Sequence, residues 1–133
     1  MSGEMDLAVL LQQMEPVLAT MPYGYGLLPV GTVVPGEVAV FAVMNEDEGV
    51  TVVARAEVLD RAGIPFDGLW ARISLTVHSD LAAVGLTAAI AAALAGQGIS
   101  ANVVAGYFHD HVFVQWDSRS AAIAALQALA GRV

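Results

Sequence analysis

The hydrophobic and polar positions at the start of the chain predict a helix followed by an extended segment. Asp6 can cap the helix, and Pro16 falls in its last turn. The apolar residues of this stretch recur at helical spacing, which predicts one buried face; they are Leu7, Leu10, Leu11, Met14 and Leu18. Residues 23–30 are predicted to be extended, and residues 32–36 to form a turn.

The next stretch has the pattern of a hairpin and a short helix. Residues 38–44 are mostly apolar and predict a buried strand. The acidic segment 45–49 predicts a hairpin turn, after which residues 50–54 pair back. Glu57 to Ala62 predicts a short helix that Gly63 ends.

Residues 64–68, which contain Pro65 and Gly68, are the predicted seam between two halves. We therefore expect an N-terminal half at residues 1–66 and a C-terminal domain at residues 67–133. A chain of 133 residues is long enough for two such small halves to bury a core.

The C-terminal half begins with a predicted strand and a predicted helix. Ile73, Leu75 and Val77 alternate with polar residues, as in a strand with one packed face. An apolar stripe then predicts a helix over residues 84–95 that ends at two glycines; the stripe is Leu86, Ile90 and Leu94, and the glycines are Gly96 and Gly98.

Two strands and a last helix follow. Residues 102–105 and 112–115 are predicted strands on either side of a polar turn. Asp117 or Ser118 can cap the last helix, whose packed positions are Ile123, Leu126 and Leu129. The order strand, helix, strand, strand, helix predicts an α+β, ferredoxin-like fold with an antiparallel or mixed sheet covered by helices. The first half could be a degenerate copy, although no residue-level internal repeat is visible.

Composition excludes several classes of function. The chain has 13 acidic residues, five arginines, no lysine and a net charge of −8, which disfavours nucleic acid and anionic membranes as partners. Cysteine is absent, so disulfides and thiolate chemistry are excluded, in keeping with the cytoplasmic localisation that we expect. No apolar run approaches the about 20 residues of a membrane span. Because so few residues are charged, we expect apolar surface to be covered in a homodimer.

Three histidines offer a possible metal site. His109 and His111 flank Asp110, and an extended chain would direct both imidazoles to one side. Together with His78 they could hold a metal ion. The alternatives are that these histidines are solvated or hydrogen-bonded, or that they hold an organic ligand directly. No nucleotide-binding motif and no other cofactor motif occurs.

The two turns of the C-terminal half carry groups that suit a zwitterion. Ser79 and Asp80 are placed to cap the 84–95 helix, and Ser79 cannot readily share a proton with the adjacent His78 because neighbours on a strand point to opposite faces. The free N–H groups at the helix entrance attract a carboxylate, and Gly85 would let it approach the backbone. Asp110 could receive an ammonium group beside the carbonyl of Gly106, or could serve only as a turn former.

Three segments of the C-terminal half resemble the ACT domain: VHSDLAAVGLTAA at 77–89, GISANVVA at 98–105 and YFHDHVFV at 107–114. The resemblance is to a family of small bacterial proteins of poorly defined function, in which an ACT domain follows an ACT-like half. The third segment is also similar to the ACT repeats of the animal cytosolic arginine sensor.

The resemblance implies tandem ACT-like halves of βαββαβ type, dimerisation, and regulatory binding of a free amino acid without catalysis or cofactor. It places the ligand between the loop that enters the first ACT helix and the facing strand and turn. The implied contacts are His78, Ser79, Asp80, Val84, Gly85, Leu86, Asn102, Gly106, Tyr107, Phe108, His109 and Asp110.

Three hypotheses follow. The first is a non-enzymatic module that binds an amino acid and regulates an unknown effector protein. The second is a protein-interaction module with no small ligand, which uses its alanine-rich helix face and strand edges. The third is a metal-dependent enzyme built on the three histidines.

Overall fold

The computed structural model describes residues 6–76 and 85–131, and the chain divides into two compact units. Unit 2 comprises Thr20–Trp70, and unit 1 combines Met1–Ala19 with Ala71–Val133. This division differs from the expected linear halves 1–66 and 67–133, because the N-terminal segment belongs to the same unit as the C-terminal part of the chain.

The sheet of unit 1 explains this arrangement. Its strands are β1 (Pro16–Leu18), β5 (Trp70–Leu75), β6 (Asn102–Ala105) and β7 (Asp110–Gln115), in the order β1-β5-β7-β6. Strand β1 is antiparallel to β5, with Pro16 opposite Leu75 and Leu18 opposite Ile73. The N-terminal segment thus supplies one edge strand of a sheet whose other strands all follow unit 2 in the sequence.

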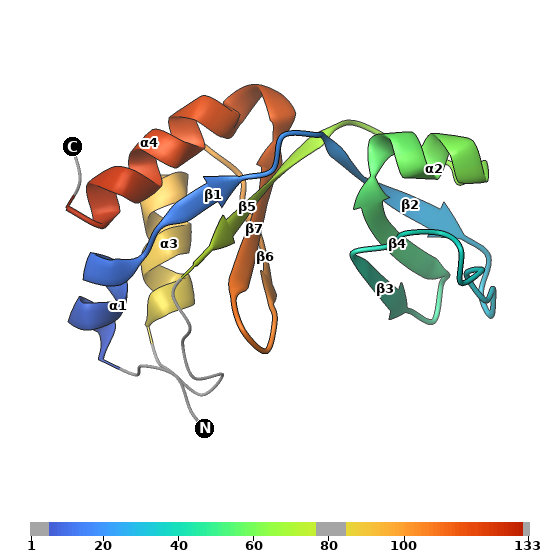
Figure 1. The fold of residues 1–133 in the computed structure, drawn as a ribbon, viewed down its shortest axis with the longest axis horizontal. Helices are drawn as coiled ribbons and strands as arrows, with labels where there is room; N and C mark the ends of the chain where they lie inside the picture. The colour runs from blue at the N-terminus through green and yellow to red at the C-terminus, as the bar shows by residue number, and fades with distance from the viewer. Residues whose placement is uncertain (1–5, 77–84, 132–133) are drawn as a thin grey trace. The chain divides into compact units, whose positions relative to one another are not determined.

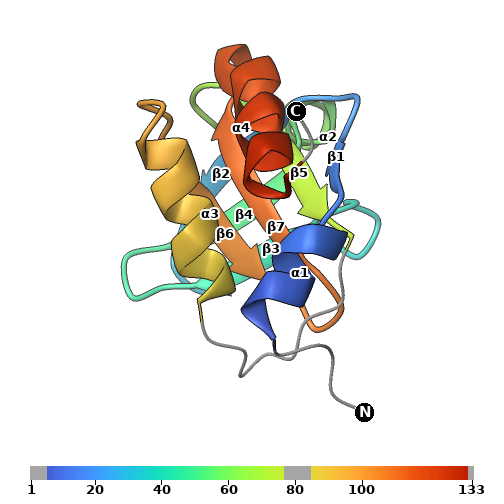
Figure 2. The same ribbon diagram turned by 90° about the vertical axis from the view of Figure 1, so that its left-hand side faces the viewer.

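Two helices cover one face of this sheet (Figures 1 and 2). They are α3 (Leu86–Ala95) and α4 (Arg119–Leu129), and the short 3-10 helix η1 (Trp116–Ser118) leads into α4. The strand-helix-strand-strand-helix order predicted for the C-terminal half is confirmed over the described residues. A further helix, α1 (Leu7–Gln13), packs beside α3.

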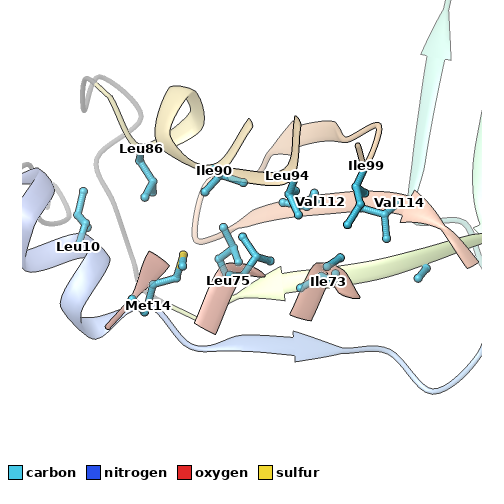
Figure 3. Packing of buried hydrophobic residues seen from close by; sticks show 14 residues of the cluster. Leu10, Met14, Ile73, Leu75, Leu86, Ile90, Leu94, Ile99, Val112 and Val114 are labelled. Carbon is cyan, nitrogen blue, oxygen red and sulfur yellow. The ribbon is translucent and has the colours of Figure 1, made fainter. Parts of the chain in front are cut away.

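The core of unit 1 lies between this sheet and its helices (Figure 3). The predicted stripe of α3 is confirmed, because Leu86, Ile90 and Leu94 are all buried. In α4, Leu126 is buried as expected, whereas Ala122 is buried in place of Ile123 and Leu129, which are only partly covered. The small Ala122 allows α4 to approach the sheet closely.

The N-terminal helix is capped as predicted but is shorter than expected. A side-chain oxygen of Asp6 accepts hydrogen bonds from the backbone N–H groups of Ala8 at 2.9 Å and Val9 at 3.3 Å. The helix ends at Gln13, so the prediction that Pro16 and Leu18 belong to it is wrong. Proline cannot donate within a helix, and an edge strand tolerates it.

Unit 2 contains three strands and one helix. Its elements are β2 (Tyr23–Leu28), β3 (Ala42–Asn45), β4 (Val50–Arg55) and α2 (Ala56–Ala62), with the strand order β3-β4-β2. The predicted hairpin turn is confirmed: the N–H of Glu46 donates to the carbonyl of Gly49 at 2.9 Å. Gly63 ends α2 in a left-handed conformation, as predicted.

One prediction for unit 2 is wrong. The buried strand expected at residues 38–44 is instead the four-residue strand β3, which is largely exposed because it lies at the sheet edge. In the segment 64–68, Ile64 is buried in the core of unit 2 and Phe66 forms a β-bridge with Gly26.

The two units repeat one design. Each has a β-hairpin, β3-β4 or β6-β7, followed at once by a helical segment, and each hairpin lies beside one further strand, β2 or β5. Strands β4 and β7 have the same burial pattern over six residues, which makes Val50 the counterpart of Asp110. Between β2 and β3, residues 29–41 contain turns but no helix, whereas the corresponding connection of unit 1 contains α3. Unit 2 is therefore a copy of the fold without its first helix.

Glycines in β2 allow α2 and the segment after it to pack closely on the sheet. A Cβ atom on Gly26 would lie 2.6 Å from Cγ2 of Ile64. We expect Gly26→Ala to lower the free energy of unfolding by about 1–3 kcal/mol, because the core must shift to admit the methyl group. Chemical denaturation measures this loss. The matched control is Gly36→Ala, where an added Cβ meets nothing within 4 Å. Equal stability of the two variants would contradict the prediction.

The N-terminal segment contributes fully buried side chains to unit 1. Leu10 of α1 is completely inaccessible and belongs to the same core cluster as Leu75 and Leu86. Leu10→Ala is expected to destabilise the protein by about 2–5 kcal/mol, the usual cost of such a cavity. The change in amide hydrogen exchange should extend to β5 and β7. Gln13→Ala, an exposed position of the same helix, serves as the control and should leave exchange in those strands unchanged.

Candidate functional site

Asp110 is the one buried polar or charged residue in the described parts of the chain, with 8% of its surface exposed. It is the first residue of β7 and lies opposite Ala105 of β6. Because side chains alternate along a strand, Asp110 shares a face with Val112 and Val114, both of which belong to the core. The carboxylate therefore sits on the helix-covered face of the sheet, at its end.

Burial perturbs this carboxyl group. Desolvation raises the pKa of Asp110 above its ordinary value, and the nearby His109 partly opposes the shift. No ion pair or hydrogen bond of the Asp110 side chain is formed with residues 6–76 or 85–131. Burying a carboxylate costs free energy unless a cation or hydrogen-bond donor compensates.

The fold does not require a carboxylate here. Val50 takes the corresponding position in unit 2 and is 1% exposed. An apolar side chain fills the same place in the same design, and it does so without a desolvation penalty. Packing alone therefore does not explain why a carboxylate occupies this position.

Asp110 was predicted to lie in the turn between the last two strands, whereas in the structure it is the first residue of β7. The turn comprises Gly106 to His109, closed by the N–H of Gly106, which donates to the carbonyl of His109 at 2.9 Å. Tyr107 and Phe108 at its tip are 62% and 64% exposed and stack edge to face with ring centroids 5.1 Å apart. The turn thus ends two residues earlier than expected, which brings Asp110 into the strand.

His111 points to the opposite face of the sheet from Asp110. Its Nδ1 shares a hydrogen bond with Oγ of Ser74 on β5, at 2.9 Å. Burial lowers the pKa of His111, and the charges of Arg72 and His109 lower it further. Sequence reasoning did not single out Ser74 and Arg72, although the alternation along residues 72–76 already placed both on the polar face.

The start of α3 differs from the expectation in its cap. Gly85, at a φ of 101°, occupies the N-cap position and has no side chain to satisfy the first N–H groups of the helix. A Cβ atom there would lie 3.2 Å from Cδ2 of Leu7, so α1 packs against this glycine. Leu86 directs its side chain into the core and is 3% exposed. The remaining predicted residues of this loop, His78, Ser79, Asp80 and Val84, lie outside the described residues.

The structure brings some of the predicted residues together and separates others. Figure 1 shows the turn between β6 and β7, the end of β5 and the start of α3 at the same end of unit 1. The first residue of β7 and the N-cap of α3 therefore lie toward the same end of unit 1. Asn102 does not, because it pairs with Phe113 and is three residues along β6 from the partner of Asp110, a distance of about 10 Å.

The described residues give no evidence for the predicted metal site. Over residues 6–76 and 85–131, no three histidine or acidic side chains form a group that could hold a metal ion. The third member of the predicted trio, His78, lies outside those ranges. Nor is any helix in the described ranges both long and apolar enough to cross a membrane.

Comparison with known families matches both halves of the chain. Residues 2–71 match one profile described as an ACT domain, and residues 67–128 match a second profile with the same description. The chain belongs to the ACT domain family. The fold expected from the resemblance is thereby confirmed, and the profile over residues 2–71 includes the helix-deficient unit 2.

Solved structures show the same tandem ACT architecture over nearly the whole chain. A protein of unknown function from Vibrio cholerae, described as a possible transport protein, is 42% identical with a TM-score of 0.82, covering 97% of this chain and 99% of that one. A protein from Agrobacterium tumefaciens is 16% identical with a TM-score of 0.74, covering 89% and 90%.

The fold also occurs in a known regulatory protein. The regulatory subunit of aspartate kinase from Thermus thermophilus, in a ligand-free form, is 15% identical with a TM-score of 0.62, covering 88% of this chain and 98% of that one. At this identity the likeness concerns the fold alone. None of the curated proteins matches the chain.

The buried carboxylate of this ACT protein makes a prediction about stability and pH. Because the pKa of Asp110 is raised in the folded state, ionisation destabilises the fold increasingly as the pH rises from the ordinary aspartate pKa of about 3.9 through the raised value. Asp110→Asn should therefore unfold at a higher denaturant concentration than the parent at pH 7, with the difference vanishing near pH 3. Asp47→Asn, in the exposed hairpin turn, is the control and should show no such pH-dependent gain. If Asp110→Asn is less stable than the parent protein at pH 7, the prediction is wrong.

Proposed function

We propose that the chain is a non-enzymatic regulatory ACT module that binds a free amino acid at the end of unit 1 where Asp110 lies. The observation that carries this proposal is the carboxylate of Asp110, buried and without an ion pair among residues 6–76 and 85–131, where the sister unit has Val50. A ligand ammonium group would compensate a buried carboxylate, since charge-assisted hydrogen bonds are among the strongest in proteins.

The other charge of an amino acid has a counterpart in the same region. The start of α3 presents N–H groups that the N-cap residue Gly85 cannot satisfy, and this helix end attracts carboxylates. The start of α3 lies at the same end of unit 1 as the turn before Asp110 (Figure 1). An amino acid would span these two groups, with the predicted contacts His78, Ser79, Asp80 and Val84 completing the site.

The regulatory part of the proposal draws on the fold. The same tandem ACT fold occurs in the regulatory subunit of an aspartate kinase. We propose that this chain acts likewise on an effector protein in the cytoplasm, and that it does so as a homodimer. Ligand binding near Leu7, which packs on Gly85, would change the packing of α1 and so transmit occupancy to the rest of unit 1.

A second candidate function, protein interaction without a small ligand, is favoured by exposed apolar side chains. Strand β3 forms a sheet edge and exposes Val43 and Met44 at 40% and 42%. Tyr107 and Phe108 project from the turn of unit 1. Unprotected strand edges and exposed aromatic residues are typical of partner-binding surfaces.

A thermal unfolding screen against the common amino acids separates these two functions. An amino acid present at 100 times its dissociation constant should stabilise the folded protein by about 2.7 kcal/mol, which raises the melting temperature by several degrees. Asp110→Ala should weaken binding of that amino acid about tenfold or more, because it removes the partner of the ammonium group. Asp47→Ala is the matched control. A flat response across the panel would favour the interaction module.

The pH dependence of binding provides an independent check. Only the ionised carboxylate of Asp110 attracts an ammonium group, and its pKa in the free protein is raised. Affinity for the amino acid should therefore fall as the pH is lowered through that raised pKa, and Asp110→Asn should abolish this dependence. Unchanged pH dependence in the variant would place the ligand elsewhere.

A further inference from the structure

Unit 2 contains a cavity of its own. It has a volume of about 260 Å³ and lies between the coil that replaces the first helix and helix α2. The coil contributes Glu37, Val38 and Ala39, the end of β4 contributes Arg55, and α2 contributes Val58, Arg61 and Ala62. All of these residues belong to unit 2, so this cavity is separate from the region around Asp110.

The cavity has a structural cause. In unit 1, α3 packs directly against α4. In unit 2 the connection that corresponds to α3 is residues 29–41, which form turns and coil. A helix with its side chains is about 10–12 Å across. The coil does not fill that volume against α2, although its residues Val34 and Val38 do pack on the core.

The charges around the cavity are of both signs and come from different segments of unit 2. Arg61 comes from α2, and Glu37 comes from the coil. Within residues 6–76 and 85–131, neither side chain forms an ion pair, whereas Arg55 is held by Glu57 at 3.3 Å. Arg61 and Glu37 are therefore free to receive a ligand's carboxylate and ammonium groups. Two of the five arginines of a chain with net charge −8 line this one cavity.

The rest of the lining is apolar. Val58 is 6% exposed and forms part of the core beneath the cavity, and Val38 and Ala62 flank it. A volume of about 260 Å³ falls just below the about 300–1,000 Å³ range of drug-sized pockets. Such a space suits a molecule of amino-acid size with an apolar side chain.

We propose that unit 2 holds a second small-molecule site, in which this cavity binds an apolar α-amino acid with its carboxylate on Arg61 and its ammonium group on Glu37. Guanidinium groups bind carboxylates through two parallel hydrogen bonds, which fixes the orientation of the ligand. The apolar side chain then rests on Val58 and Ala62. This site does not depend on Asp110, so either site can exist without the other.

The test is isothermal titration calorimetry of the full-length protein with valine, leucine, isoleucine, methionine and phenylalanine at up to 10 mM. At least one of them should bind, and Arg61→Gln and Glu37→Gln should each weaken that binding event about tenfold or more. Arg119→Gln in unit 1 changes the net charge equally and should have no effect. Ala62→Leu places a larger side chain in the lining of the cavity without changing any charge or weakening the helix, and it should weaken the event.

Two analogues of leucine examine the two charged groups separately. 4-Methylpentanoate lacks the ammonium group, so its binding should be insensitive to Glu37→Gln and still sensitive to Arg61→Gln. 3-Methylbutylamine lacks the carboxylate and should show the reverse pattern. If leucine is not the amino acid that binds, the deamino and decarboxy analogues of the one that does take their place.

The outcomes distinguish this site from the one proposed in unit 1. Binding lost in Arg61→Gln and retained in Asp110→Ala supports the cavity, whether or not a separate amino acid binds at Asp110. Binding lost only in Asp110→Ala overturns the cavity site and leaves the function proposed for unit 1 intact. Absence of binding by all five amino acids, or binding unchanged in both Arg61→Gln and Ala62→Leu, also overturns it.

Discussion

The antiparallel pairing of β1 with β5 is the constraint from which the rest of the architecture follows. It joins a strand near the N-terminus to a strand that begins at Trp70, and so it makes everything between them a separate unit. Without β1, residues 73–75 of β5 would lack their partner strand on that edge. The segment that precedes β1 also supplies Leu10 and Met14 to the core that contains Ile73 and Leu75. The linear halves that the family profiles match are thus not the units that fold together.

Within that frame, the two units show what the ACT design needs and what it can do without. Strands β4 and β7 bury the same positions, and each passes directly into a helical segment. The differences between the units are local: a carboxylate replaces a valine at the end of β7, and a coil replaces a helix beside α2. The carboxylate loses solvation, and the coil leaves packing space beside α2. Both candidate sites lie at these two positions, where the units differ. This agrees with the general observation that binding groups reduce local stability.

Much of the C-terminal fold could be predicted because its periodicity is strong. Leu86, Ile90 and Leu94 define one helical stripe, and Ile73 and Leu75 define a strand face, so local pattern and tertiary burial coincide. The prediction of a buried strand at residues 38–44 was wrong because an edge strand need not be buried. The prediction that Leu18 is helical was wrong because an apolar residue at helical spacing also suits a strand. The division into units depends on the long-range pairing of β1, which has no local signal.

The candidate sites were predictable in part. Asp110 and the start of α3 were indicated by residue type and by the resemblance to ACT domains, but the burial of Asp110 could not be, since it depends on where the turn ends. Arg61 and Glu37 are 24 positions apart, and each looks like an ordinary surface charge. They line a cavity because no helix forms between β2 and β3, and this could be recognised only in the folded unit.

The position of β1 also sets the order in which the protein can acquire its structure during synthesis. Unit 2 is complete in sequence once Trp70 has left the ribosome, so it can fold while the rest of the chain is still being made. Residues 6–19 have by then been synthesised, but the strand and helices on which they pack have not. The apolar side chains of α1 and β1 must therefore wait until α4 emerges, so they stay uncovered while the segments on which they pack are synthesised.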